Sequence, residues 1–348
     1  MKRKVLGGLN INVDLVNDEH SKAKRIAFDM NDTTYRHDGF SIGQDYLRLE
    51  GKTISRGDLL PKALVIDDLI GEGAFSQVHK GLWTTHKKKG THEKQVPVAV
   101  KQFSVLDSSE QRHDMLLKEI RALCKVECKC LVQFFGAFLE KDVVTLVLEF
   151  MDRGSVEQLL KRKSNGLGEN FVASLTFQML WGLSYLHHEK IIHRDIKPGN
   201  VLIHSTGQIK LCDFGIVSLS EQTLSSTVVG TSRYMAPERL RAQPYGRSSD
   251  MWSAGLVILE CITGKCRWGD CTSIVSLLMT VEEASPETMV PDSISSTKLK
   301  EMLHSCLNQD PGKRIPAKLL LKSPWFQKDH DIATLSDAIK VSKDSYPC

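Results

Sequence analysis

Between residues 63 and 150 the chain alternates short apolar runs with polar or turn-forming stretches. This pattern is typical of an antiparallel meander, in which each apolar run forms one strand. Residues 109–124 have helical spacing instead, because Leu116, Ile120 and Leu123 fall at i, i+4 and i+7 and share one face. The strand-like runs are residues 63–66, 77–83, 96–103, 131–139 and 143–150.

Beyond Gly154 the spacing of the apolar residues is helical. A strand-rich part followed by a helix-rich part predicts an α+β fold. We therefore expect two lobes that join between Glu149 and Gly154: a small antiparallel β-rich N-lobe (64–149) with one main helix, and a larger, mostly α-helical C-lobe (155–327). The helices predicted for the C-lobe are residues 155–162, 170–189, 249–263, 273–281 and 297–307.

Two polar segments flank this body. Residues 1–60 are weakly periodic, so we expect an extension that is largely mobile and docks in part on the folded body, and residues 328–348 form a C-terminal tail. Within the extension, residues 2–11 combine Lys2-Arg3-Lys4 with Leu9-Asn10-Ile11. Cations followed by alternate apolar side chains suit an acidic patch beside an apolar groove on a partner, which favours a docking peptide. A basic segment without a docking role is the alternative.

Composition narrows the class of protein. Hydrophobic residues make up 41% of the chain and charged residues 25%, as in ordinary globular proteins. The net charge of +4 gives no support for nucleic-acid binding. The apolar run from Val143 to Met151 is too short to cross a bilayer, and we find no signal peptide, so we expect no membrane insertion. Nine cysteines without an export signal indicate reduced thiols, so we predict a cytoplasmic location and leave the nucleus open.

A glycine-rich turn, Gly71-Glu72-Gly73-Ala74-Phe75-Ser76-Gln77-Val78, follows the first strand. Glycines have no Cβ, so such a turn can bring its backbone close to phosphate oxygens. Many glycine-rich hairpins are only turns, however, and Ser76 stands where a third glycine is frequent. A dinucleotide-binding turn would need a helix directly after it, whereas strand-like residues follow here.

Lys101 and Glu119 form the second candidate feature. Lys101 ends a strand that should otherwise be buried, and a lysine whose ammonium reaches the surface is one interpretation. Glu119, however, lies on the apolar face of its helix, where an unpaired carboxylate is costly. Lys101 is its natural partner. Such a pair would hold the lysine toward the α- and β-phosphates of a nucleotide.

The strongest signal is the polar run His193-Arg194-Asp195-Ile196-Lys197-Pro198-Gly199-Asn200, which has apolar residues on both sides. It predicts a loop anchored at both ends, where catalytic groups tend to lie. Asp213-Phe214-Gly215 follows shortly afterwards. Mg²⁺ prefers oxygen ligands, which Asn200 and Asp213 supply. Asp195 could accept the proton of an incoming hydroxyl, with Lys197 beside the migrating phosphoryl group.

In their order and spacing these motifs resemble the eukaryotic protein kinase domain, over residues 64–327. Gly230-Thr231, Ala236-Pro237-Glu238, Asp250 to Gly255 and Arg314 extend the match. The resemblance implies a bilobal protein kinase fold that transfers phosphate from Mg-bound ATP to a protein hydroxyl. It also implies a buried Glu238–Arg314 ion pair and a stacked spine that includes Leu123, His193 and Phe214. Lys197 and Thr231 match the serine/threonine type.

The resemblance assigns the site residue by residue. Catalysis falls to Asp195, Lys197 and Lys101, and metal binding to Asn200 and Asp213. Leu148 matches the gatekeeper beside the backbone groups that bind adenine. The residues expected around ATP are Ile70, Gly71, Glu72, Gly73, Ala74, Phe75, Ser76, Gln77, Val78, Ala99, Lys101, Glu119, Leu148, Glu149 and Met151.

A narrower resemblance is to mitogen-activated protein kinase kinases, carried by residues 210–215 and 229–240. It implies a dual-specificity kinase that phosphorylates Thr and Tyr in a downstream mitogen-activated protein kinase. An upstream mitogen-activated protein kinase kinase kinase would activate it at Thr223 and Thr227, with Ser225 and Ser226 as rival sites. New phosphate there could pair with Arg194. A Ser/Thr-rich loop without regulatory modification is the alternative for this segment.

Two other functions stay open. One is another serine/threonine kinase of the same cascade, either the kinase one tier higher or a Ste20-like kinase. The other is a pseudokinase scaffold that keeps the fold without the reaction. The presence of Lys101, Asp195, Asn200 and Asp213 argues against the scaffold.

Overall fold

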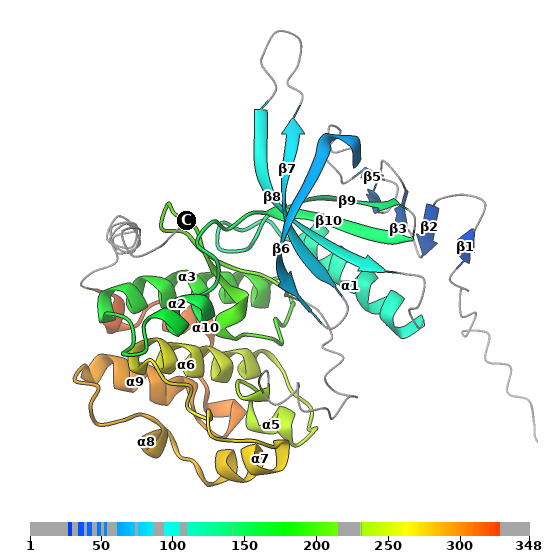
Figure 1. Ribbon diagram of the computed structural model, residues 1–348. Helices are drawn as coiled ribbons and strands as arrows, with labels where there is room; N and C mark the ends of the chain where they lie inside the picture. The colour runs from blue at the N-terminus through cyan, green and yellow to red at the C-terminus, as the bar shows by residue number, and fades with distance from the viewer. Residues whose placement is uncertain are drawn as a thin grey trace, which may run out of the picture.

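The computed structural model has a sheet-rich upper lobe and a helical lower lobe, so the predicted two-lobed α+β fold is confirmed (Figure 1). The structure describes residues 27–29, 34–37, 40–43, 47–49, 52–53, 61–73, 76–85, 94–104, 110–140, 142–214, 230 and 232–327.

The N-lobe is built on an antiparallel five-stranded sheet in the order β6-β7-β8-β10-β9. Valines recur along β8 and β10, and such β-branched residues favour strands. Helix α1 (Glu110–Lys125) connects β8 to β9 along the chain and crosses below the sheet in Figure 1. The strands are β6 (Leu64–Glu72), β7 (Gln77–Thr85), β8 (Lys94–Ser104), β9 (Phe134–Glu140) and β10 (Val143–Glu149).

Side chains from the two faces of this sheet enter two separate apolar clusters. Phe138 of β9 belongs to a small cluster with Trp83, Val98 and Val100. Its neighbour Leu139 belongs to the main core, which also holds side chains of α1 and of the C-lobe. Successive side chains of a strand point to opposite faces, so two adjacent residues of β9 serve two different cores.

A second five-stranded sheet precedes the N-lobe sheet in the chain, inside the segment for which the sequence pattern predicted an extension. Its strands β3 and β4 contact β9, and the backbone N–H of Leu139 donates to the Gly43 carbonyl at 2.9 Å. Part of the segment therefore docks on the N-lobe. The strands are β1 (Ala27–Asp29), β2 (Thr34–His37), β3 (Phe40–Ile42), β4 (Leu47–Leu49) and β5 (Lys52–Thr53).

Helices α3 (Glu169–His188) and α6 (Arg247–Thr263) pack together in the middle of the C-lobe, and α9 (Thr297–Cys306) packs on α6. Almost every position of α6 from Ser249 to Cys261 is buried, as expected of a central helix. Gly264 ends α6 with φ of 71°, a left-handed conformation that favours glycine. The other helices are α2 (Val156–Arg162), α5 (Pro237–Leu240), α7 (Ile274–Glu283), α8 (Pro286–Met289) and α10 (Ala317–Leu320). The 3₁₀ turns are η1 (Pro61–Ala63), η2 (Pro198–Asn200), η4 (Pro311–Lys313) and η5 (Pro324–Gln327).

None of the helices in the described part of the chain is long and apolar enough to span a bilayer.

The loop that carries the polar motif lies between α3 and a two-stranded sheet. This sheet consists of β11 (Val201–Ile203) and β12 (Ile209–Leu211), which the sequence analysis did not predict as a pair. The strand predicted for 131–139 begins later than expected, at Phe134. Leu131 instead forms an isolated parallel bridge with Leu211, which ties the start of that segment to β12.

Candidate active site

Three charged side chains from distant parts of the chain meet between the lobes. Lys101 comes from β8, Glu119 from α1 and Asp213 from the residues after β12. The Lys101 Nζ atom lies 3.0 Å from Glu119 Oε1 and 2.8 Å from Asp213 Oδ1. Lys101 and Glu119 are 5% and 4% exposed, respectively. The expected ion pair is present, and Lys101 is a buried cation rather than a surface lysine.

The surroundings fix the charges of these groups. Burial alone would lower the pKa of Lys101, but the charges of Asp213 and Glu119 outweigh it and raise this pKa above its ordinary value. Burial raises the pKa of Glu119, against the opposing effect of Lys101. The pKa of Asp213 is lowered: burial works against ionisation, but Lys101 and Lys197 favour the carboxylate. The Asp213 side chain is 37% exposed. We attribute its ionised state to the two lysines. Asp213 is thus a carboxylate suited to binding a cation.

Asp195 is held by two neighbours in the polar loop. Lys197 Nζ lies 2.8 Å from Asp195 Oδ2, and Asn200 Nδ2 donates to the same oxygen at 2.8 Å. Asn200 lies on η2, whose Pro198 fixes the turn. The Cys212 N–H donates to the Asn200 carbonyl at 3.1 Å, which brings Asn200 next to Asp213. Asn200 and Asp213 together offer an amide oxygen and a carboxylate, ligand types that fit Mg²⁺.

One buried carboxylate on α6 fixes the backbone of this loop. Asp250 is 1% exposed and accepts hydrogen bonds from the His193 and Arg194 N–H groups, each at 2.9 Å, and from His187 Nε2 at 2.8 Å. Burial would raise the pKa of Asp250, but these donors lower it and keep it ionised. Arg194 has φ of 73°, so the Asp250 carboxylate holds a residue in a strained conformation. The ring of His193 meets that of Phe214 edge-on at 6.4 Å.

Hydrogen bonds of the Glu149 side chain hold the segment that joins the lobes. The Glu149 carboxylate accepts from Lys210 Nζ at 2.7 Å and from the Gln133 N–H at 3.1 Å. Leu148 is paired with Ala99 across β10 and β8, and Met151 follows as a buried residue. Lys210 of β12 thus supports the segment that joins the lobes, and the binding of adenine by this segment stays a prediction.

The register of the strands aligns the glycine-rich turn with Lys101. Gly71 is paired with Val78, and Val78 with Lys101, across β6, β7 and β8. The Gly73 N–H donates to the Ser76 carbonyl at 2.8 Å, which closes the turn. At its base, Gln77 Nε2 donates to Glu72 at 3.5 Å, and Ile70 is 44% exposed. Ala74 and Phe75 lie outside the described residues.

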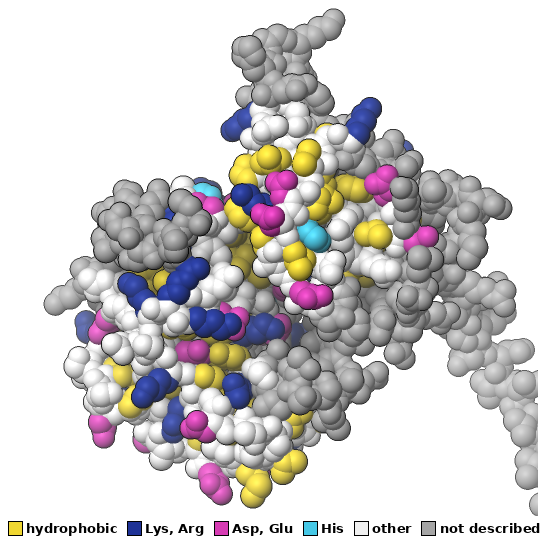
Figure 2. All heavy atoms as spheres, in the orientation of Figure 1, with side chains coloured by type: hydrophobic (Ala, Val, Ile, Leu, Met, Phe, Trp, Pro, Cys, Tyr) yellow, Lys and Arg dark blue, Asp and Glu magenta, His cyan; other side chains and the backbone are white. Residues whose placement is uncertain are grey.

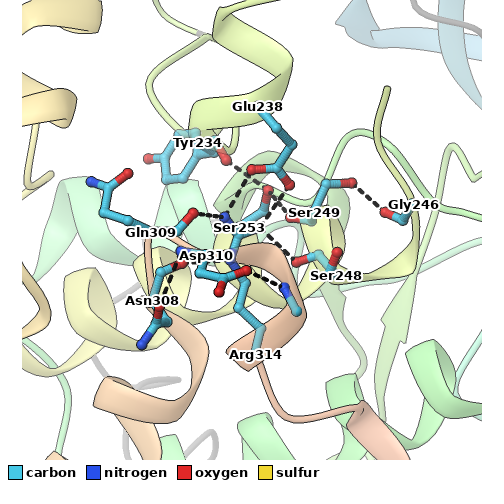
Figure 3. Close-up of polar contacts among 11 residues, drawn as sticks. Tyr234, Glu238, Gly246, Ser248, Ser249, Ser253, Asn308, Gln309, Asp310 and Arg314 are labelled. Carbon is cyan, nitrogen blue, oxygen red and sulfur yellow. Dashed lines mark hydrogen bonds and ion pairs between the residues drawn. The ribbon is translucent and has the colours of Figure 1, made fainter. Parts of the chain in front are cut away.

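A bidentate ion pair anchors the short helix α5 to the end of the C-lobe. Arg314 donates to the two carboxylate oxygens of Glu238 at 2.7 and 2.8 Å (Figure 3). The same guanidinium donates to the carbonyls of Asn308 at 2.7 Å and Ser248 at 3.1 Å. The Arg314 side chain is fully buried. The Glu238–Arg314 pair that the sequence predicted is therefore present.

A cavity of about 480 Å³ opens beside Lys197. Its wall includes Glu157 of α2, Gly199 of the polar loop, and Arg233 and Tyr234 before α5. Figure 2 shows charged side chains of both signs on the upper part of the C-lobe, next to the junction with the N-lobe. Lys197, which is paired with Asp195, places the cavity next to the polar loop.

Several residues predicted to be functional lie outside the described part of the chain. Two further residues support the site although the sequence analysis did not assign them to it. Thr223, Thr227 and the docking peptide 2–11 lie outside the described residues. Asp250 and Lys210 were not predicted as supports of the site. The position of Asp250 directly before a mostly apolar stretch of its helix is a signal that could have indicated a buried carboxylate in need of donors. Lys210 offers no comparable signal, because its partner Glu149 is far away in the sequence.

The comparisons with known proteins agree with this geometry. The family described as "Protein kinase domain" matches residues 64–326. Mitogen-activated protein kinase kinase 2 of Arabidopsis thaliana is 35% identical over 232 residues, which are 64% of this chain and 63% of the relative. Mitogen-activated protein kinase kinase 1 of the same plant is 35% identical over 238 residues, 66% of this chain and 67% of the relative. The mitogen-activated protein kinase kinase kinase ANP1 of Arabidopsis thaliana is 33% identical over 273 residues, 77% of this chain and 40% of the relative. The chain thus spans less than two thirds of the first and third of these proteins.

Proposed function

We propose, given that this chain belongs to the protein kinase family, that it is a dual-specificity kinase which phosphorylates Thr and Tyr in a downstream mitogen-activated protein kinase. As members of this family do, it uses ATP and a divalent metal ion, and we propose Mg²⁺ as that ion. Two ion pairs carry the proposal: Lys101 of the N-lobe binds Asp213, and Lys197, which binds Asp195, also helps to lower the pKa of Asp213.

In this mechanism the charged groups first hold the nucleotide. Lys101, kept in place by Glu119, binds the α- and β-phosphates, and the turn between β6 and β7 covers them with backbone N–H groups. Asn200 and Asp213 would hold Mg²⁺, which would supply positive charge to neutralise the phosphates. The backbone of Glu149 and Met151 binds adenine beside Leu148. The side-chain bonds of Glu149 to Lys210 and Gln133 support this segment.

Asp195 then accepts the proton of the protein hydroxyl. The hydroxyl oxygen bonds to the γ-phosphorus while the bond from that phosphorus to the β–γ bridging oxygen breaks, and ADP leaves. Lys197 stabilises the charge on the phosphoryl oxygens during this transfer. The 2.8 Å contacts of Asp195 with Lys197 and Asn200 support these roles, because they fix the orientation of the carboxylate.

We assign activation to phosphorylation at Thr223 and Thr227 by an upstream mitogen-activated protein kinase kinase kinase. The Nε atom of Arg194 is buried and has no hydrogen-bond partner within the described part of the chain. A phosphate provides strong acceptors for a guanidinium, so in this proposal phosphate at Thr223 or Thr227 pairs with Arg194. Residues 2–11 serve in this proposal as the docking peptide for the substrate kinase.

The first test is Asp195→Asn in the full chain. We expect turnover to fall by at least about a hundredfold, because positioned general bases contribute roughly that much. ATP affinity, measured by titration with a fluorescent nucleotide, should change little. Turnover equal to that of the unmodified protein would remove Asp195 from the mechanism, and a chain without any phosphoryl transfer would favour the pseudokinase scaffold.

The second test identifies the tier of the cascade. The substrate is a mitogen-activated protein kinase made inactive by substitution, and mass spectrometry locates the phosphate. Phosphate on both Thr and Tyr is the expected result. Phosphate on Ser or Thr alone, with a mitogen-activated protein kinase kinase as the better substrate, would favour the higher tier to which ANP1 belongs by name. Mass spectrometry of the active chain itself tests Thr223 and Thr227 against Ser225 and Ser226.

A further inference from the structure

Two apolar side chains of the sheet that precedes the kinase domain are fully buried on the N-lobe. Ile42 at the end of β3 is 1% exposed, and Leu47 at the start of β4 is 0% exposed. The register pairs Ile42 with Leu47 directly across the two strands. Side chains opposite each other in an antiparallel pair lie on the same face, so these two form a single apolar contact surface.

This surface packs into the main core. Ile42 and Leu47 belong to the same buried cluster as Ile120 and Leu123 of α1 and Leu139 of β9. Strands β3 and β4 contact β9, and the Leu139 N–H donates to the carbonyl of Gly43, the residue after Ile42. In Figure 1, β3 lies at the same end of the N-lobe as the ends of β9 and β10, above α1. Backbone and side-chain contacts therefore both fix the pair.

The position of α1 decides whether the site is complete. Glu119, the partner of Lys101, is adjacent to Ile120 on this helix. Leu116 is only partly buried, so the described apolar contacts of α1 depend strongly on Ile120 and Leu123. If the cluster that these two share with Ile42, Leu47 and Leu139 becomes less well packed, the helix gains freedom to move away from the sheet, and the Glu119 carboxylate with it.

We propose that Ile42 and Leu47 are positioning residues for phosphoryl transfer, which hold α1 where Glu119 reaches Lys101. The inference rests on the proposed function. It also gives the extension a regulatory role, because an event that detaches β3 and β4 from β9 lowers kinase activity without any contact with the nucleotide. The competing explanation is that the pair contributes to stability alone.

A double-mutant cycle in the full chain separates these explanations. The four proteins are the unmodified chain, Leu47→Ala, Glu119→Gln and the double variant. Leu47→Ala should lower kcat/KM for ATP by about tenfold in the unmodified background but less than about twofold when Glu119→Gln is present, because residues that act through one another are not additive. An equal loss in both backgrounds would overturn the inference.

Two controls address stability. Phe138→Ala removes a buried side chain of β9 from the opposite face of the sheet, in the separate small cluster. It should destabilise the N-lobe without the loss of kcat/KM that Leu47→Ala produces at a temperature where both variants are folded. Leu47→Met keeps most of the buried volume and should restore kcat/KM to within about threefold.

Hydrogen exchange provides a readout that does not need activity. Leu47→Ala should accelerate amide exchange in α1 (Glu110–Lys125) more than Phe138→Ala does. Unchanged exchange in α1 would overturn the inference, whatever the kinetics. If the unmodified chain transferred no phosphate but α1 responded as expected, the proposed function would fail while the role of Ile42 and Leu47 in positioning α1 would stand.

Discussion

Replacement of Arg314 by methionine should destabilise the folded chain by about 3 to 5 kcal/mol, because it leaves a buried carboxylate without its cation. The side chains of Arg314 and Glu238 are 0% and 5% exposed, so water cannot take the place of the guanidinium. Methionine is flexible and fills most of the space of the arginine stem, so the cavity contributes little. Most of the cost comes from the Glu238 charge, with a smaller part from the Asn308 and Ser248 carbonyls.

Urea unfolding followed by circular dichroism measures this cost directly. For a domain of this size the loss corresponds to a fall in Tm of about 6 to 20 °C. The matched variant is Glu238→Leu combined with Arg314→Met, which removes both charges. The double variant should lose only about 1 to 3 kcal/mol of stability relative to the unmodified chain, less than the single variant, because only the unpaired carbonyls remain.

Two results would refute this reasoning. If the single variant lost less than about 1 kcal/mol, Glu238 would not depend on Arg314 for its stability in the interior. If the double variant were as unstable as the single one, the cost would not come from an uncompensated charge. Because Glu238 follows the cavity-wall residues Arg233 and Tyr234 closely in the chain, the single variant should also raise KM for the protein substrate more than KM for ATP.

Two further substitutions test local features. Hydrogen bonding from Cys130 lowers the pKa of Cys128 to about 6, against the effect of burial, so this thiol ionises more readily than an ordinary cysteine. Alkylation of Cys128 should therefore slow down only as the pH falls below about 6, and it should be far faster than alkylation of Cys212, because burial raises the pKa of Cys212. The variant Cys130→Ala should move the midpoint of the pH profile toward that of an ordinary thiol. An unchanged midpoint would exclude the hydrogen bond as the cause. Gly255→Ala would place a Cβ 2.8 Å from the Cys306 Cβ, between α6 and α9, and should cost about 1 to 3 kcal/mol in urea unfolding. A variant as stable as the unmodified chain would show that the two helices separate easily.

The sequence was most informative where the chemistry depends on neighbouring residues. Asp195, Lys197 and Asn200 lie within one short loop, so their spacing alone predicted that they would meet. Glu119 could be paired with Lys101 because a carboxylate on an apolar helix face needs a cation. In both cases a local pattern contained the information, and the 3.0 Å distance between Lys101 and Glu119 agrees with it.

Contacts between distant segments were harder to predict. The strands β1 to β5 have only two to four residues each, too few for a clear alternation of apolar and polar positions. The pairing of Ile42 with Leu47 depends on register, which periodicity does not provide. The support of Glu149 by Lys210 likewise depends on the tertiary fold, since the two residues are 61 positions apart.

The docking of β3 and β4 on β9 also bears on how the protein should be divided for study. The family match begins at residue 64, which suggests a natural place to cut a shorter fragment. Such a fragment would lack Ile42 and Leu47 and would expose the apolar surface that they cover, including part of the surroundings of Leu139. The buried surface of the N-lobe therefore extends beyond the family match, and a fragment trimmed to residue 64 should aggregate more readily than the full chain.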